Sequence, residues 1–364
     1  MKKMRQNLQA IEHKALQKDN KTTIHYGLTI NIDINDFNIE NISLKENIAE
    51  INISTPKEVK ITDVKKTRVQ FKEEFENSFN KFHKENSAQI TKIVVPKNHI
   101  IKEPITIHTN TVSKNTLQEF FFEIEENTEV TIIDVLSDQT KEDGYNSRLI
   151  NILAKKGSKV NYFCIQKLND KKVHYEKKVF IARESAKINI KEFSIGSKVS
   201  ISETKTILEG QGASAKVQNN FFSSQKQQFD IKAEAIHKAK NTYSELLGKG
   251  VIKDSSKSLY RGNIHIQENA HNSEGFQKSK LLLIDKDAQA DAIPQLLIDN
   301  NEVKCSHAVA IGRINSDKIF YFMTRGISEE EAKREIIRGF FESTLDGLDE
   351  QSADILREEI KRKT

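Results

Sequence analysis

A short phrase returns along the middle of this chain at nearly constant spacing, and it limits the possible folds more than any other feature. "NTEVTI", "GSKVNY", "SAKINI" and "ASAKVQ" each place a β-branched residue after a charged one, at Val130, Val160, Ile188 and Val217. These positions are 30, 28 and 29 residues apart, and a fainter echo falls at Tyr243. A recurrence of this length is typical of stacked repeats, each burying its apolar face on its neighbours.

Short β-rich runs surround these phrases from about residue 90 onward, among them "TKIVV", "EVTIIDVL" and "KINIKEFSI". No amphipathic helix interrupts them until about residue 328. Strands at a fixed repeat without intervening helices predict a β-solenoid, although a β-sandwich also has short strands and regular turns. The chain has only 4 Pro and 14 Gly. This disfavours a hairpin-rich sandwich, which depends on glycine-containing tight turns.

Helical spacing marks both ends of the chain. The segment "FKEEFENSFNKF" puts Phe71, Phe75, Phe79 and Phe82 on one helix face, which we interpret as core. Near the other end, Ser328 is a favourable N-cap and Glu331 completes a capping box. The sequence therefore predicts an N-terminal helical region over 1–90, a β-helix core over 91–325 and a C-terminal helical region over 326–364.

The C-terminal helix carries a bulky apolar stripe. Its members are Ile336, Ile337, Phe340, Phe341 and Leu345. Such a stripe either packs on the end of the solenoid or binds a partner in helix-in-groove fashion. Neighbouring residues on a helix diverge by about 100°, so the stripe cannot turn all of its members toward one surface.

The composition indicates which kinds of partner and which cellular compartment to expect. The 57 basic residues are interleaved with 52 acidic ones and tryptophan is absent, so neither a basic stripe nor an aromatic platform indicates nucleic acid. No apolar run approaches the roughly 18–20 residues that span a membrane. Two distant cysteines form no disulfide framework, which is typical of a reducing cytoplasm.

Common enzyme motifs are absent from the sequence, including the phosphate loop GxxxxGK[ST], GxGxxG after a strand, HExxH, CxxC and GxSxG. Asp285, Asp287 and Asp291 lie close together in the sequence. A β-helix carbohydrate-active enzyme would use clustered carboxylates in a groove. Turn residues at a solenoid corner explain the same three aspartates, and we keep both readings.

Cys305 and His307 form the one suggestive pair, within "VKCSHAVAIGR". On a strand, residues two apart face the same side with α-carbons roughly 6.5–7 Å apart. This is wide for two ligands of one zinc ion, but it suits two contacts on an iron–sulfur cluster or ligands at an interface. A nucleophile with its base, or ordinary strand packing, also fits. Cys164, inside "NYFCIQ", is expected to be a core residue.

The residues around this pair carry a resemblance. The segment "LLLIDKDAQADAIPQLLIDNNEVKCSHAVAIGRINSDKIFYFMTRGISEEEAKREIIRGFF", residues 281–341, resembles the SufB/SufD family of iron–sulfur cluster assembly proteins. The shared elements are A-x-A-D…P-x-L, D-(E/V)-V-K-C-(S/T)-H, FY(F/L)-x-(S/T)-RG-I and an E-A helix ending in G-F. "YRGNIHIQENAHNSEGFQKSK" continues it more loosely, and the region before about residue 240 agrees only in texture.

The resemblance implies a right-handed parallel β-helix (a β-solenoid) flanked by N- and C-terminal helical regions. It also implies a non-catalytic scaffold in the cytoplasm, which pairs with a SufB-like chain while a SufC-like ATPase hydrolyses ATP. The ATPase would dock on the C-terminal helical region through Ile336, Ile337, Phe340 and Phe341. No cofactor is expected on the chain alone; a transient iron–sulfur cluster is expected in the complex, and flavin binding is left open.

Within the family, the sequence resembles SufD more than SufB. SufB-like chains carry a cysteine where this chain has Lys278, whereas the K-C-(S/T)-H form is SufD-like. The resemblance makes His307, with Cys305 as a possible assistant, a ligand for a cluster at the subunit interface. Ala308 and Val309 depart from the Gly-Ala usual after this histidine. A homodimeric SufB/SufD relative is the alternative to a heteromeric partner.

Overall fold

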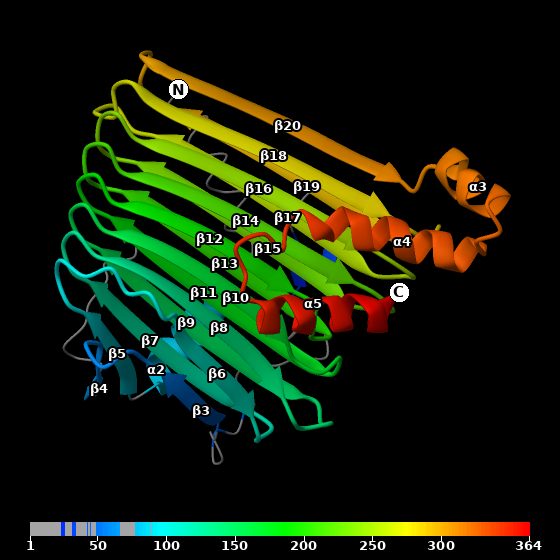
Figure 1. Ribbon diagram of the computed structural model, residues 1–364, viewed down its shortest axis with the longest axis horizontal. Coiled ribbons are helices and arrows are strands. Elements are labelled where there is room, and N and C mark those ends of the chain that lie inside the picture. Colours follow the sequence, from blue (N-terminus) through cyan, green and yellow to red (C-terminus); the bar gives the residue numbers. More distant parts are fainter. Residues whose placement is uncertain are drawn as a thin grey trace.

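The computed structural model describes residues 23–25, 31–33, 42, 44, 49–65, 77–87 and 89–364. In this part of the chain, two nine-stranded sheets lie face to face and form a β-solenoid (Figure 1). A separate antiparallel pair consists of β1 (Thr23–His25) and β2 (Asn31–Asp33). The prediction of a mainly β protein built as a parallel β-helix is confirmed.

Successive strands alternate between the two sheets. Sheet I consists of β3 (Ala49–Ser54), β6 (Ile105–Thr111), β8 (Glu129–Asp138), β10 (Lys159–Lys167), β12 (Lys187–Ser194), β14 (Ser214–Ser223), β16 (Tyr243–Ile252), β18 (Ser273–Leu283) and β20 (Val303–Arg313). Sheet II consists of β4 (Lys60–Lys65), β5 (Gln89–Val95), β7 (Thr116–Ile124), β9 (Gly144–Ala154), β11 (Lys172–Ala182), β13 (Val199–Leu208), β15 (Gln228–His237), β17 (Lys257–Ile266) and β19 (Gln289–Ile298).

The repeat in the sequence corresponds to one solenoid turn. Val160 pairs in register with Val130 on one side and with Ile188 on the other, as the spacing predicts. Val217 differs, because its partner on β12 is Ile190, two residues beyond Ile188. A shift of two preserves the alternation of strand side chains, so Val217 still faces the interior. Tyr243 pairs with Ser214, which precedes the inward-facing Ala215, and it is only half-buried.

Inward-facing aliphatic and aromatic side chains from both sheets form one continuous core along the solenoid axis. Cys164 belongs to this core, with 2% of its surface exposed. The prediction that Cys164 is a core residue is therefore confirmed.

One corner of the solenoid repeats a left-handed residue on successive turns. Asn127, Gly157 and Ser185 have φ values of 51°, 67° and 55°, and Asn241 and Asn272 repeat the conformation later. Each backbone N–H at this corner donates to a carbonyl of the next turn, as from Asn127 to Lys156 at 2.9 Å. Glycine and asparagine tolerate positive φ, so these residues set the corners without a hairpin turn.

Helices cover the outer faces of both sheets. Against sheet II lies α2 (Ser78–Asn86), where Phe79 packs against Tyr145 and Tyr175. Against sheet I lie α4 (Glu329–Glu342) and α5 (Glu350–Lys363), which cross its face in Figure 1. Between β20 and α4, α3 (Ser316–Thr324) projects beyond the sheet.

The predicted core spans 91–325. The parallel pairing of β5 with β7 begins at Thr91, and the last strand ends at Arg313, where α3 follows after two residues. The N-terminal region contains α2 but also the strands β3 and β4, which pair antiparallel with β6 and β5. Phe79 and Phe82 lie on α2, while Phe71 and Phe75 lie outside the described residues.

Candidate functional site

The C-terminal end of the solenoid is an open end, defined by the last strands β19 and β20. Among the described strands, each has a hydrogen-bonded neighbour on one side only, so the backbone N–H and C=O groups of its other edge have no strand partner there. The apolar side chains exposed on these two strands are Ile293, Leu297, Ile298, Val309 and Ile311. An apolar, unpaired strand edge is a surface prepared for another chain.

The structure places Cys305 and His307 together on this open end. In register with β18, Cys305 lies beside Gly275 and His307 beside Gln277. Cys305 packs against the core and is half-buried, with its Sγ 3.6 Å from the Cβ position that a side chain at Gly275 would occupy. His307 is exposed, because no further turn covers it. The strand alternation turns both side chains to one face, as the sequence predicts.

The Cys305 thiol and the His307 imidazole differ in how readily they can donate electrons to a metal. Burial raises the pKa of the Cys305 thiol, although a backbone hydrogen bond involving Gly275 partly opposes the shift. A thiol with a raised pKa is a poor thiolate donor until a metal or a basic partner approaches. The side chain of His307 forms no hydrogen bond or ion pair with the described residues. Its imidazole is therefore the readily available donor of the pair.

Within the described ranges, no three His, Cys, Asp or Glu side chains are grouped so that they could hold a metal ion. At the open end, Cys305 and His307 are therefore not part of a larger group of such side chains among these residues. Lys278 is exposed on β18 and pairs with Ala308. Just beneath the open end lies a small cavity lined in part by Tyr260, Gln277 and Ser279.

The apolar stripe of the C-terminal helix divides between two environments. Ile337 and Phe341 are buried, with 1% and 2% of their surfaces exposed, and they pack on sheet I beside Phe222. Ile336 and Phe340 are half-buried, and Phe340 lies under the ammonium groups of lysines from β16 and β18. While α4 is docked, sheet I covers Ile337 and Phe341, so Ile336 and Phe340 are the two of the four predicted contact residues that reach the surface.

The exposed apolar surface of this region lies instead on α3, and sequence reasoning missed it. Phe320, Tyr321 and Met323 have exposed fractions of 68%, 59% and 48%. Among the residues that the structure describes, α3 is the one helix with no buried side chain. The apolar run "IFYFM" contains these three residues and was the available signal, but it was interpreted only as part of a family motif.

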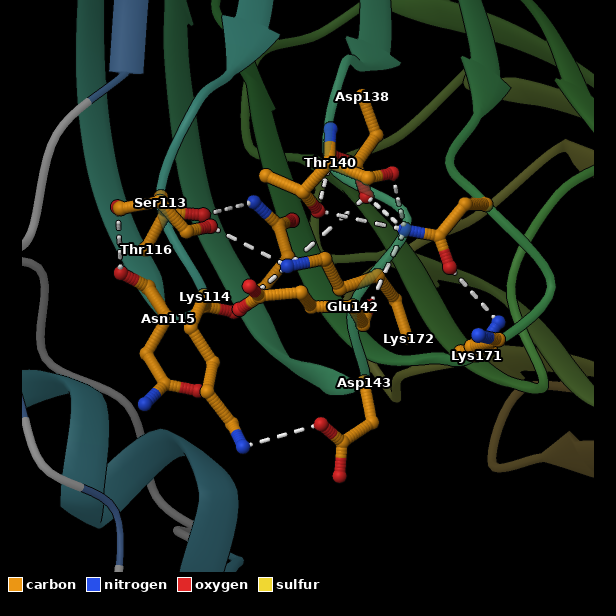
Figure 2. Close-up of polar contacts among 12 residues, drawn as sticks. Ser113, Lys114, Asn115, Thr116, Asp138, Thr140, Glu142, Asp143, Lys171 and Lys172 are labelled. Atoms are coloured by element: carbon orange, nitrogen blue, oxygen red, sulfur yellow. Dashed lines mark hydrogen bonds and ion pairs between the residues drawn. The ribbon is translucent and has the colours of Figure 1, made fainter.

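Away from the open end, a cluster of polar residues occupies a corner of the solenoid and joins the loops before β7, β9 and β11 (Figure 2). The Lys172 ammonium donates to the carbonyl oxygens of Ser113 and Lys114 at 3.2 and 2.7 Å and lies 3.9 Å from Asp138. Burial lowers the pKa of Lys172, with Asp138 acting against that shift. Its contacts hold neighbouring loops together, so we assign this cluster a structural role.

Of the three aspartates of the carbohydrate-enzyme alternative, Asp285 has contacts typical of a turn residue. Asp285 lies at a corner and accepts a hydrogen bond from the backbone N–H of Asp254 at 2.7 Å. Arg313 donates to the Asp285 carbonyl oxygen at 2.5 Å. These contacts fit the turn reading of Asp285. No helix in the described part of the chain combines the length and apolar character needed to cross a membrane.

Fold and site together define a β-solenoid scaffold whose open end carries a cysteine and a histidine. The profile of the family described as "SUF system FeS cluster assembly, SufBD core domain" matches residues 107–340, well over half of the chain. The chain belongs to this SufB/SufD family of iron–sulfur cluster assembly proteins.

Curated relatives agree with this assignment. An "Iron-sulfur cluster assembly SufBD family protein" of Staphylococcus saprophyticus is 28% identical over 269 residues, covering 72% of this chain and 58% of the relative. One of Staphylococcus epidermidis has the same identity and coverage. One of Mycobacterium bovis is 29% identical over 202 residues, 56% of this chain and 24% of the relative. The matched part of the chain thus spans less than two thirds of the length of these relatives.

Proposed function

We propose that this chain is a SufD-like, non-catalytic scaffold subunit of a SUF assembly complex in the cytoplasm. Its open end pairs with the corresponding end of a SufB-like chain, and a transient iron–sulfur cluster forms between them. A SufC-like ATPase binds its C-terminal helical region. The observation that carries the proposal is the exposed His307 beside Cys305 on an unpaired strand edge.

The ligand inventory supports a shared rather than a self-contained cluster site. Clusters are commonly held by four ligands, mostly thiolates. This chain has two cysteines, and Cys164 is buried in the core. Cys305 and His307 therefore supply at most part of a ligand set, and the partner supplies the rest. Lys278, in place of the SufB-type cysteine, supports the SufD-like assignment.

The exposed surface of α3 supports the docking of an ATPase. Phe320, Tyr321 and Met323 present aromatic and thioether groups to solvent, which is typical of a protein-binding surface. Only Ile314 and Asn315 separate α3 from β20. A partner on α3 would accordingly lie close to the strand that carries the proposed cluster ligands. Ile336 and Phe340 are the members of the earlier stripe that stay available at its margin.

Co-purification tests the proposal. The chain is co-expressed with SufB-like and SufC-like proteins from one source, and the complex is isolated through a tag on this chain. We expect both partners to be retained. Phe320→Glu with Tyr321→Glu should lose the ATPase by at least 10-fold and keep the SufB-like chain. The matched control is Ile51→Glu, an exposed isoleucine on β3, which should keep both partners.

Absence of the ATPase from the wild-type complex, or its retention by the α3 double variant, contradicts the docking proposal. The open end also supports the homodimeric alternative, because two copies of this chain can pair through the same edges. Light scattering separates the two readings. The proposal expects the SufB-like chain to displace any homodimer at equal concentrations, whereas a persistent homodimer supports the alternative.

A further inference from the structure

Five charged side chains lie buried inside the solenoid, in turns well below the open end. They are Asp134 on β8, Arg148 on β9, Glu176 and Lys178 on β11, and Glu192 on β12. None of them has more than 3% of its surface exposed. Their positions face the interior between the two sheets, where a solenoid of this kind otherwise packs aliphatic residues.

The contacts among these groups form one connected network. Two hydrogen bonds, of 2.8 and 2.7 Å, join Arg148 to Asp134, and Arg148 lies 3.4 Å from Glu176. Lys178 donates to Glu176 and lies 3.4 Å from Glu192. Arg148 and Lys178 therefore both contact Glu176, while Glu192 is at the end of the network and contacts a single cation, Lys178, which it shares with Glu176.

The charges in this network do not balance. Three carboxyl groups face two permanent cations, so full ionisation would leave a net negative charge inside the protein. An uncompensated buried charge costs several kcal/mol, and such a group normally binds a proton instead. Asp134 accepts two hydrogen bonds from Arg148 and Glu176 contacts both cations, whereas Glu192 has only the Lys178 ammonium, which lies closer to Glu176. Glu192 is consequently the carboxyl group that can be neutral at the lowest cost.

Neutral hydrogen-bonding groups surround Glu192. The Thr204 hydroxyl donates to one carboxyl oxygen at 2.6 Å, and the Asn219 amide lies 2.7 Å from the other. The amide oxygen of Asn219 has no hydrogen-bond partner in the described part of the chain. Because amide oxygen and nitrogen are interchangeable by a flip, Asn219 can donate to an ionised Glu192 or accept from a protonated one.

We propose that Glu192 is a proton-binding site inside the solenoid, neutral at pH 7, with Asn219 as the partner that adapts to its protonation state. The site does not depend on the proposed function. In register, its column runs from Glu192 through Asn219, Gly248 and Ser279 to Val309 on the open edge. Ser279 of this column also lines the small cavity beneath β20.

The groups around the site agree with this assignment. Burial raises the pKa of Glu192, which Lys178 only partly offsets. Burial acts on Glu176 as well, but Lys178, His174 and Arg148 outweigh it and hold the pKa of Glu176 well below the usual range. The titratable and charged groups that face the network from its packed strands are Asp134, Arg148, Tyr162, Cys164, His174, Glu176, Lys178 and Tyr260.

The linkage has a definite sign. A carboxyl group with a raised pKa binds more protons in the folded state than in the unfolded state, so stability falls as pH rises through the interval between the two pKa values. Glu176 has the opposite shift, and its contribution is lost only when pH falls below the usual range of a glutamate. The two neighbouring glutamates therefore respond to amide substitution in opposite ways.

The experiment compares Glu192→Gln with Glu176→Gln in the full chain, by denaturant unfolding between pH 5 and 8. Glutamine is isosteric with protonated glutamate, so Glu192→Gln should fold, match or exceed the wild-type midpoint at pH 8, and remove part of the wild-type decline with pH. Glu176→Gln should lower the midpoint at every pH. The infrared C=O band of a buried protonated carboxyl should be present in the wild type at pH 7 and absent from Glu192→Gln.

Several outcomes overturn the proposal. One is the absence of the protonated-carboxyl band at pH 7, and another is its persistence in Glu192→Gln. A Glu192→Gln variant that fails to fold, or that loses as much stability as Glu176→Gln, equally contradicts a neutral Glu192. In that case Glu192 is ionised and belongs to an ordinary buried ion-pair network.

Discussion

The two ends of the solenoid differ in the length and the charge of their edge strands. At the N-terminal end, β3 and β4 are 6 residues each and pair antiparallel with the first turns. The sequence of β4, "KITDVK", is charged at three of its six positions. At the open end, β19 and β20 are 10 and 11 residues long, and residues 305–312 of β20 carry no Lys, Arg, Asp or Glu.

Short, charged edge strands are a common protection against edge-to-edge association, and long uncharged ones promote it. The difference teaches that the edge strands of one end are protected against pairing, whereas those of the other end, the site of the proposed pairing, are not. The proposed cluster ligands, Cys305 and His307, lie on the open edge and not on the protected one. Stability should therefore depend on interior residues, whereas assembly should depend on residues of the open end.

The largest expected effect is on the free energy of unfolding, and it compares a buried residue near the N-terminal end with an exposed residue of the open end. Ile93, on β5 beside the protected end, is fully buried, so Ile93→Ala leaves a cavity and should lower the free energy of unfolding by about 2–5 kcal/mol. Val309→Ala, on the exposed open edge, should change the isolated chain by less than about 0.5 kcal/mol. Urea unfolding of both variants measures the contrast, and equal losses would contradict it.

The next effect concerns assembly. Val309→Lys places a charge on the open edge and should weaken pairing with the SufB-like chain by at least about 10-fold, which corresponds to about 1.4 kcal/mol. Ile51→Lys is the matched change on β3, where a similar fraction of the isoleucine is exposed, and it should leave pairing unchanged. Sedimentation or surface binding gives the dissociation constants. If the β3 variant is the weaker binder, the roles of the two ends are reversed.

A smaller effect tests the attachment of the C-terminal helices. The Ser328 hydroxyl accepts a hydrogen bond from the Glu331 backbone N–H at 3.2 Å and caps α4. Ser328→Ala should cost about 1 kcal/mol of stability. Ser328→Asp should keep most of it, because a carboxylate also caps a helix N-terminus. Thermal unfolding compares the two, and an unchanged alanine variant would show that the cap is dispensable.

The repeat in the sequence favoured the solenoid over a sandwich, because each turn of a solenoid must bury the same inward positions on its neighbours. It predicted the pairing of Val130, Val160 and Ile188, but it could not reveal the two-residue shift at Val217. Both registers keep an apolar residue inside, so the pattern alone does not separate them. The helix beginning after Ser328 was likewise readable from its cap and its apolar spacing.

Other features needed the three-dimensional structure. Spacing showed that Ile336, Ile337, Phe340 and Phe341 could not all face one way, but only the packing on sheet I shows which of them are buried. The strands β3 and β4 pair with residues far along the chain, and short strands lack a periodic signal. The Glu192 network was also hidden, since Asp134, Arg148 and Glu192 converge only when the turns stack.

The most direct test of the account is the cluster content of the His307→Ala complex. The variant is co-expressed with SufB-like and SufC-like partners, purified anaerobically, and analysed for iron and acid-labile sulfide per complex. His99→Ala, an exposed histidine far from the open end, is the control. The account predicts a normally assembled His307→Ala complex that has lost most of its iron and sulfide, with the control unchanged. A fully loaded His307→Ala complex would contradict the claim that the open end supplies a cluster ligand.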